Sequence, residues 1–365
     1  MSTTKKALVP SVVGTGLIVL DVTVSAVTPA PAHPVWTGGT CGNVLAILSF
    51  LGWKSHAVGR IGNDAAGTCL LRDLLDSGVD SKNIDREAAG TPIILHRVSV
   101  DRRGGVRHGY AFECPQCDRR YPSFRPVLVS RAEALAGVAG VASVFFFDRV
   151  SRGILDMAAA ARKNDAIVVF EPSASSEEKQ FVEAYEVSDV VKYARERRAK
   201  FDPWLEKAAS RRRVPLEIET RGAEGLAFRL RGERRWRTRE AMPVPYLRDA
   251  SGAGDWLTAG FLYAAARDGG ISKVLIEPEA VERALQVGEA LAAFNCQFEG
   301  PRGAMYASDV DATTQMLNVV DARVRRKLTR ETKRPALRMT LTGICSACVD
   351  AKKAPTEAGE DTVLP

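Results

Sequence analysis

The stretch Asp249–Asp255 reads D-A-S-G-A-G-D, and the apolar run W-L-T-A-G-F-L follows it directly. A glycine-rich turn at the start of a helix leaves backbone N–H groups without intrahelical partners, here those of Gly252, Ala253 and Gly254. These donors and the positive end of the helix dipole together favour a bound anion such as phosphate. The same letters also fit a plain capped helix after a glycine-rich turn, so the rest of the chain must decide between the two.

The acid that closes this run, Asp255, indicates what such an anion site would do. A carboxylate repels a bound phosphate, and its place there makes sense only if it takes part in the chemistry. Beside a phosphate it can accept the proton of an incoming hydroxyl group. The stretch therefore predicts phosphoryl transfer to an alcohol, with Asp255 as the general base.

Other glycine-containing motifs lie on both sides of this stretch. They comprise G-L-I-V-L-D ending at Asp21, the pair Gly38 and Gly39 followed by Asn43, G-R-I-G-N-D-A-A-G with Gly59, Gly62, Asp64 and Gly67, and T-R-G-A-E-G with Thr220, Gly222 and Gly225. In this order, from about residue 11 to about residue 320, they resemble the ribokinase-like (phosphofructokinase-B type) family of carbohydrate kinases. That family's signatures are a Gly-Gly pair followed by Asn, G-x-D-x-x-G, and D-T-x-G-A-G-D.

The resemblance implies an ATP-dependent kinase that transfers the γ-phosphoryl group to a hydroxyl of a sugar or sugar-like substrate, with Mg²⁺ beside ATP. Besides Asp255 as base and Gly252, Ala253 and Gly254 as anion hole, it assigns substrate hydroxyls to Asp21, Gly38, Gly39 and Asn43. On the cofactor side it assigns Thr220, Gly222, Gly225, Asn295 and Glu196. The chain has no G-x-x-x-x-G-K-[ST] motif, so the phosphates must be held in another way, which the anion hole provides.

Two departures from the family pattern concern the phosphates and the metal. Ala250 stands where the family has Thr, and Tyr193 stands at the Asn position of the N-x-x-E motif, which here reads Y-A-R-E with Glu196 kept. These changes leave a second class open, a sugar- or nucleotide-binding sensor with little or no turnover. Within the kinases, a nucleoside kinase is the alternative, because substrate choice depends on the pocket and not on the fold.

Strand and helix patterns alternate through the chain, which predicts an α/β fold with a mainly parallel sheet between two helical layers. The resemblance narrows this to a ribokinase-like three-layer sandwich with a small β lid. We expect a kinase domain over residues 1–322, with lid segments at about 22–37 and 92–125, the latter containing a hairpin over Ile93–Val100 and Val106–Phe112. Residues 323–365 form a basic C-terminal tail.

Four of the seven cysteines form two C-x-x-C pairs, Cys114 with Cys117 and Cys345 with Cys348. Each pair has the spacing of half a structural zinc site, although the pairs lie far apart in the chain. One shared zinc would fold the tail over the lid insertion. A redox pair, incidental thiols, or a metal shared between two subunits of a homodimer formed through the lid are the alternatives.

The remaining features concern charge and location. The net charge of +7 gathers in basic clusters and in the tail, but no nucleic-acid-binding motif accompanies them, so we expect solvated faces and no nucleic-acid partner. Lys5, Lys6 and the apolar run after them imitate a secretory signal. We instead expect one buried strand over Ser11–Val24, no membrane span, and a cytoplasmic protein with reduced cysteines.

Overall fold

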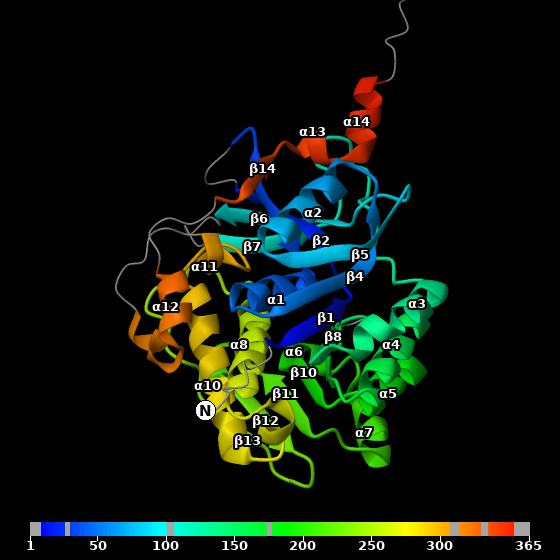
Figure 1. The fold of residues 1–365 in the computed structure, drawn as a ribbon. Coiled ribbons are helices and arrows are strands. Elements are labelled where there is room, and N and C mark those ends of the chain that lie inside the picture. Colours follow the sequence, from blue (N-terminus) through cyan, green and yellow to red (C-terminus); the bar gives the residue numbers. More distant parts are fainter. Residues whose placement is uncertain are drawn as a thin grey trace, which may run out of the picture.

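Two β-sheets organise the part of the chain that the structure, a computed structural model, describes: residues 9–25, 30–100, 106–173, 177–306, 314–329 and 335–353. A nine-stranded sheet carries helices on both faces, and a five-stranded sheet stands at one end of it (Figure 1). The expected turn 101–105, parts of the expected lid segment 22–37 and residues 354–365 of the tail lie outside the described residues.

The nine-stranded sheet is parallel from β5 to β11 and antiparallel only at the edge formed by β12 and β13. This arrangement confirms the mainly parallel sheet that the alternating pattern predicts. The strands, in spatial order, are β13 (Arg237–Arg239), β12 (Leu226–Leu230), β11 (Leu216–Thr220), β10 (Val190–Ala194), β9 (Ile167–Phe170), β8 (Val144–Phe147), β1 (Ser11–Thr15), β4 (Lys54–Gly62) and β5 (Val79–Glu87).

Helices cover both faces of this sheet, and each face has its own apolar core (Figure 1). The central strands are apolar on both sides, as in V-F-F-F of β8, because both of their faces are buried. One face carries α3 (Val129–Gly140), α4 (Arg152–Lys163), α5 (Glu178–Val187) and α7 (Asp202–Arg211), and the other carries α1 (Gly39–Phe50), α8 (Ala253–Arg267) and α10 (Pro278–Asn295).

Shorter or peripheral helices complete the described chain. Asp64 caps the first of them by accepting a hydrogen bond from the N–H of Gly67 at 2.8 Å, which explains the acid in the G-x-D-x-x-G motif. These helices are α2 (Ala65–Asp76), α6 (Arg195–Arg198), η1 (Gly222–Glu224), α9 (Ile271–Val274), α11 (Gly303–Tyr306), η2 (Thr314–Val319), α12 (Ala322–Leu328), α13 (Leu341–Ile344) and α14 (Ser346–Lys353).

The five-stranded sheet, called the small sheet below, joins strands from three distant parts of the chain. The expected hairpin is present as an antiparallel pair, and the C-terminal segment adds an edge strand that the sequence did not predict. In spatial order the strands are β14 (Leu337–Met339), β3 (His33–Gly38), β2 (Val19–Ser25), β6 (Ile93–Val100) and β7 (Val106–Ala111).

The expected single strand over Ser11–Val24 is wrong, because the structure divides it between the two sheets. β1 ends before Gly16, which has φ +143°, and β2 begins at Val19 in the small sheet. A Cβ at position 16 would lie 1.8 Å from Oδ1 of Asp148, and that oxygen accepts a hydrogen bond from the Leu17 N–H at 2.7 Å. The chain turns at this point because glycine alone fits the space beside Asp148.

A buried ion pair connects the small sheet to the rest of the protein. Arg302 and Asp73 are 0% and 1% exposed, and Nη2 of Arg302 lies 2.7 Å from Oδ2 of Asp73. The same nitrogen donates to the backbone carbonyl of Thr37 on β3 at 2.6 Å, and the Thr37 N–H donates to Asp73 at 2.8 Å. One guanidinium therefore fixes β3, helix α2 and the loop before α11 to one another.

We expect Asp73→Asn to lower the free energy of unfolding by about 3–5 kcal/mol, because it leaves the guanidinium of Arg302 buried without its counter-charge. Chemical unfolding of both proteins measures the difference. Arg72→Ala, which removes the half of the Arg72–Asp76 pair that is 65% exposed, is the control and should change stability by less than about 1 kcal/mol. Equal effects of the two substitutions would contradict a special role for the buried pair.

Candidate active site

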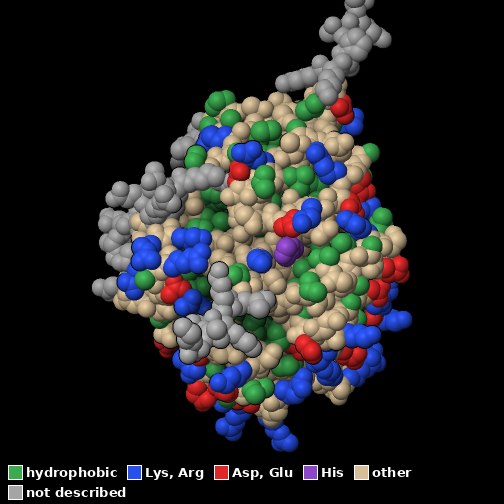
Figure 2. Space-filling model, in the orientation of Figure 1, with side chains coloured by type: hydrophobic (Ala, Val, Ile, Leu, Met, Phe, Trp, Pro, Cys, Tyr) green, Lys and Arg blue, Asp and Glu red, His purple; other side chains and the backbone are tan. Residues whose placement is uncertain are grey.

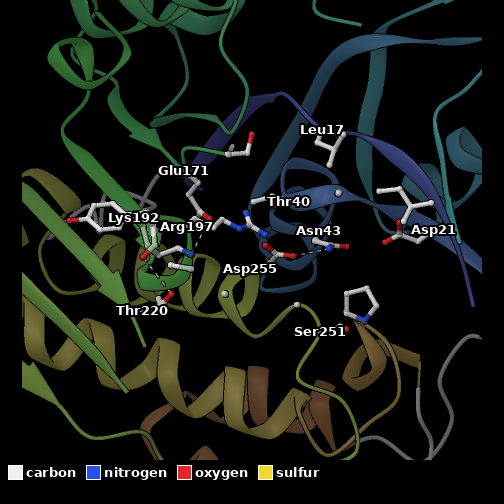
Figure 3. A pocket seen from close by; sticks show the side chains of 18 of the residues that line it. Leu17, Asp21, Thr40, Asn43, Glu171, Lys192, Arg197, Thr220, Ser251 and Asp255 are labelled. Carbon is white, nitrogen blue, oxygen red and sulfur yellow. Dashed lines mark hydrogen bonds and ion pairs between the residues drawn. The ribbon is translucent and has the colours of Figure 1, made fainter. Parts of the chain in front are cut away.

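A cleft of about 410 Å³ lies where the carboxyl ends of the parallel strands face the small sheet. Ligands of open α/β sheets bind at this end of the strands. The first turn of α8 stands in the middle of the cleft, between Asp21 and Asn43 on one side and Glu171, Lys192 and Thr220 on the other (Figure 3).

Asp255 lies in the first turn of α8 and is held by a side chain from the opposite wall. Nδ2 of Asn43, on α1, donates a hydrogen bond to Oδ2 of Asp255 at 2.7 Å (Figure 3). The two residues are 212 positions apart in the sequence, so this contact joins the Gly-Gly-Asn motif to the G-A-G-D motif. One carboxylate oxygen is thereby oriented, and the residue still lines the open cleft.

The turn before Asp255 requires glycine for steric reasons. Gly252 has φ +76°, and a Cβ there would lie 2.1 Å from the carbonyl oxygen of Pro301. Gly252 and Gly254 line the cleft at the N-terminus of the 15-residue helix α8. Ala253 is not among the lining residues, and its N–H donates to the carbonyl oxygen of Ala250 at 3.2 Å. The expected anion turn therefore faces the cleft, next to Asp255.

Burial raises the pKa of Asp255 from its ordinary value near 4 to about 8, and the nearby Glu171 carboxylate adds to the increase. The hydrogen bond from Asn43 and the positive charge of Lys192 oppose this increase. In the free protein the carboxyl group of Asp255 is therefore largely protonated at neutral pH.

Lys192 and Glu171 form a buried ion pair in the cleft wall that the sequence analysis did not include. Nζ of Lys192 lies 2.9 Å from Oε2 of Glu171, and the hydroxyl group of Thr258 on α8 donates to the other carboxylate oxygen. A Cβ at Gly254 would lie 3.4 Å from Nζ of Lys192, so the ammonium group stands beside the anion turn. The available signal was a lysine inside an otherwise apolar buried strand, since lysine is rarely buried without a function.

The substrate-side residues of the prediction come together at the small sheet. Asp21 lies on β2, and burial raises its pKa to about 7, although Arg302 and the Gly39 N–H oppose the increase. A Cβ at Gly38 would lie 1.8 Å from Oδ2 of Asp21, so glycine makes room for this carboxylate. Gly39 and the ring of Trp36 line the same end of the cleft.

The cofactor-side residues divide into two groups. Thr220, Gly222 and Glu196 line the cleft, while Gly225, with φ +91°, packs its Cα against the backbone of Arg239 and does not line it. Asn295 is fully buried and lies off the cleft. Its amide nitrogen lies 3.3 Å from the carbonyl oxygen of Pro301, and its Oδ1 accepts from the Ala304 N–H at 3.0 Å, so it braces the loop that supports the anion turn.

Two residues change the character of the nucleotide side. Tyr193, at the expected Asn position, is only 2% exposed, and no partner is found for its hydroxyl among the described residues. Its ring packs edge-on against Phe201 in the core on the opposite face of the sheet, so it places no amide group in the cleft. Arg197 also lines the cleft and brings a second positive charge close to Lys192 (Figure 3).

The two C-x-x-C pairs meet outside the cleft, at the far end of the small sheet. The sulfur atoms of Cys114, Cys117, Cys345 and Cys348 all lie within 4.8 Å of one another, a set compatible with a bound metal. Among the described residues, no other group of His, Cys, Asp and Glu forms such a cluster.

Lys and Arg side chains alternate with Asp and Glu over much of the face in Figure 2, with a denser basic group where α11 and α12 lie in Figure 1. Among the described helices, none combines the length and the apolar character needed to cross a membrane.

Comparison with known proteins identifies the family. Residues 30–306 match the family model described as pfkB family carbohydrate kinase, a span of more than half of the chain. The chain therefore belongs to the pfkB family of carbohydrate kinases, as the resemblance predicted. A search of curated proteins found no match.

Solved structures with the same fold include three kinases that are named for different substrates. A fructokinase with bound ATP from Xylella fastidiosa is 20% identical, with a TM-score of 0.63, 80% of this chain and 93% of that chain covered. A ribokinase from Arabidopsis thaliana complexed with ribose and ATP is 18% identical, with a TM-score of 0.59 and coverage of 80% and 94%. A nucleoside kinase from Methanocaldococcus jannaschii is 16% identical, with a TM-score of 0.58 and coverage of 80% and 93%. At these identities the similarity establishes the ribokinase-like fold.

The raised pKa of Asp255 predicts how the stability of the ligand-free protein depends on pH. The folded protein keeps a proton that the unfolded chain releases near pH 4, so this residue's contribution to stability is lost as the pH rises toward about 8. Asp255→Asn removes the ionisation, and we expect the variant to gain about 1–3 kcal/mol over the natural protein at pH 8.5 and nothing at pH 4.

Unfolding experiments at pH 4, 6 and 8.5 test this dependence. Asp156→Asn, on the outer surface of α4, is the control and should show no such trend, since its carboxylate is partly exposed and paired with an arginine. A stability difference between Asp255→Asn and the natural protein that is constant over this range would contradict the assignment.

Proposed function

We propose that this protein is an ATP-dependent kinase that phosphorylates a hydroxyl group of a sugar or a sugar-like molecule in the cytoplasm. One observation carries the proposal: the carboxyl group of Asp255 accepts a hydrogen bond from Asn43 at 2.7 Å and lies directly after the glycine turn at the N-terminus of α8, in the wall of the cleft. A base placed between an acceptor alcohol and a phosphate is what phosphoryl transfer requires.

The proposed reaction is a single displacement. The ionised carboxylate of Asp255 takes the proton of the acceptor hydroxyl, and the hydroxyl oxygen forms a bond to the γ-phosphorus of ATP. The bond between that phosphorus and the β,γ-bridging oxygen breaks, and ADP leaves with the bond electrons. The N–H groups of Gly252 and Gly254, at the N-terminus of α8, would donate to the oxygens on which negative charge is concentrated. The N–H of Ala253 would join them only by giving up its hydrogen bond to the Ala250 carbonyl.

The charges in the cleft wall support the binding of a triphosphate. Lys192 Nζ stands next to Gly254, and Arg197 lines the same side, so two cations face the place where the phosphates would lie. Thr220 and Gly222 would contact the nucleotide beyond them. A triphosphate near Lys192 would compete with Glu171 for the ammonium group of Lys192. The hydroxyl group of Thr258 also donates to Glu171, so this carboxylate would keep one hydrogen bond if Lys192 turned to the phosphates.

Mg²⁺ fits this site through one carboxylate. Glu196 offers oxygen ligands, which Mg²⁺ prefers, directly to the cleft, whereas Tyr193 offers no amide in the expected Asn position. Bound there with ATP, the ion would neutralise charge on the phosphates. A site with one carboxylate and no Asn holds the ion mainly through water and phosphate oxygens.

The acceptor would occupy the end of the cleft beneath the small sheet, which would act as a lid. Asp21 and Asn43 would hydrogen-bond its hydroxyl groups, and the small sheet would exclude water from the transfer. Trp36 at the same end is 6% exposed and its ring stacks on Tyr306, so the part that lines the cleft would offer an apolar contact to a sugar or a nucleobase. This ring is the observation that keeps a nucleoside as the second candidate substrate.

A ligand screen followed by an activity assay tests the function. Sugars and nucleosides are screened by thermal shift with a non-hydrolysable ATP analogue, because a ligand of the native state raises the apparent stability. Hits are then assayed for ADP formation with ATP and Mg²⁺. Binding of a sugar without ADP formation would replace the kinase by a sensor, and a preference for nucleosides would select the second substrate class.

For Asp255→Asn, we expect kcat to fall by at least ~10²-fold with little change in ATP binding, since the substitution removes the base and keeps the side-chain shape. In the natural protein, kcat/KM should rise with pH up to about 8, as the free carboxyl group ionises, and this rise should be missing in the variant. Steady-state kinetics with the best substrate measure both. Near-normal turnover of the variant would show that another group accepts the proton.

For Asp21→Ala, we expect the acceptor to bind more weakly by about 1.5–3 kcal/mol while ATP binding stays unchanged, because only the acceptor side loses a charged hydrogen-bond partner. Titration calorimetry with each ligand measures the two affinities. Ile94→Val, a neighbouring substitution in the same cleft wall that removes no polar group, is the matched control. An equal loss for both ligands would indicate damage to the small sheet and not the loss of a contact.

A further inference from the structure

Two C-x-x-C segments that are more than two hundred residues apart meet beside the small sheet. Sγ of Cys114 lies 3.7 Å from Sγ of Cys348, and Sγ of Cys117 lies 3.7 Å from Sγ of Cys345. The first pair follows strand β7; in the second, Cys345 lies between the C-terminal helices α13 and α14, and Cys348 lies on α14. The two pairs therefore cross, so that each sulfur atom of one segment faces a sulfur atom of the other.

The spacing of the four sulfur atoms matches a tetrahedral metal site. A zinc–thiolate bond of about 2.3 Å in tetrahedral geometry places the sulfur atoms ~3.8 Å apart. The two cross-segment distances equal 3.7 Å, and all four atoms lie within 4.8 Å of one another. A disulfide needs a sulfur–sulfur distance of about 2.05 Å, and it would join two of the sulfur atoms without bringing four together.

The backbone around the first pair is also shaped for thiolates. The chain reverses between Cys114 and Arg119, with hydrogen bonds of 2.9 Å from Cys114 N–H to the Arg119 carbonyl and 2.8 Å from Asp118 N–H to the Cys114 carbonyl. The N–H groups of Gln116 and Cys117 point at the sulfur atom of Cys114, and the N–H of Cys348 points at that of Cys345. Donors to the ligand atoms stabilise the negative charge of metal-bound sulfur.

We propose that these four cysteines bind one Zn²⁺ that fastens the C-terminal segment to the small sheet. The elements that the metal would hold are too short to be stable alone, since β14 has three residues and α13 has four. A four-thiolate zinc site contributes its binding free energy to the folding of such segments. This proposal does not depend on the proposed kinase reaction.

The C-terminal segment that the metal would hold pairs with a strand that reaches the cleft. β14 pairs with the outer half of β3, matching Leu337 with Val35 and Met339 with His33. The next residue of β3, Trp36, lines the cleft, and Thr37 bonds to the buried Arg302–Asp73 pair. Loss of the metal would free β14, so β3 would become an unpaired edge strand.

An exposed edge strand favours pairing with a second chain. In the structure β14 covers the β3 edge of the small sheet, and among the described residues β7 is the strand at its other edge. A homodimer through the small sheet would in this form have to use β7 or a face of the sheet. Metal loss should therefore promote self-association through β3.

Elemental analysis of the full-length protein, purified without chelators, tests the proposal, with an expected content of about one zinc per chain. The double variant Cys345→Ser/Cys348→Ser should lose the zinc, and amide hydrogen exchange in the peptides that contain β14 and the paired half of β3 should become at least about ten times faster. Cys69→Ser, an isolated thiol on α2, is the matched control and should keep both the zinc and the slow exchange.

Three results would overturn the proposal. These are a metal-free protein with a protected β14, zinc retained by the double variant, or an intact mass that is two hydrogens lower per cysteine pair under non-reducing conditions, which would identify disulfides. If the double variant is insoluble, Cys117→His provides the second test, because a histidine ligand can replace a thiolate in a structural zinc site. Zinc retained by Cys117→His supports the site, and complete loss of protection in zinc-loaded Cys117→His argues against it.

Discussion

The buried contact between Arg302 and Asp73 is the constraint on which the arrangement of this protein depends. A guanidinium without exposure to water needs a counter-charge and hydrogen-bond acceptors, and here Asp73 supplies the charge while Asp73 and the Thr37 carbonyl accept from Nη2. Because these partners come from α2 and β3, the pair fixes the β3 side of the small sheet to helix α2. The positive charge of Arg302 also opposes the increase that burial causes in the pKa of Asp21. The ion pair therefore influences a carboxyl group in the cleft wall as well as the position of β3.

In the proposed reaction the cleft would separate two tasks that make opposite demands on the protein. Phosphate needs positive potential, which the turn before Asp255, Lys192 and Arg197 supply from the backbone and from side chains. Proton transfer needs a carboxylate in poorly hydrated surroundings, which Asp255 has beside Glu171. The Lys192–Glu171 pair lies between these regions, and it lets cationic and acidic groups stand close together without a large net charge.

Local motifs made much of the fold and the centre of the site predictable from the sequence. The turn at Gly252 and the alternation of strands and helices are properties of short segments, so the local sequence is enough to predict them. Lys192 and Asn295 contact residues that short sequence motifs do not include. The sequence therefore did not predict that Lys192 places a positive charge in the cleft wall, or that Asn295 supports the loop at Pro301. The break at Gly16 was missed because an apolar run looks the same within one sheet or across two, and only the contact with Asp148 distinguishes them.

The passage of the chain from β1 to β2 has a mechanical consequence. Only the residues from Gly16 to Ile18 separate a strand of the large sheet from a strand of the small one, and the bond from Leu17 N–H to Asp148 holds this connection at its start. Any rotation of the small sheet must therefore twist the chain at these three residues. Asp21 would travel with the rotating sheet while Asp255 stays with α8. The separation of these two carboxyl groups is thus a natural coordinate for how far the cleft is open.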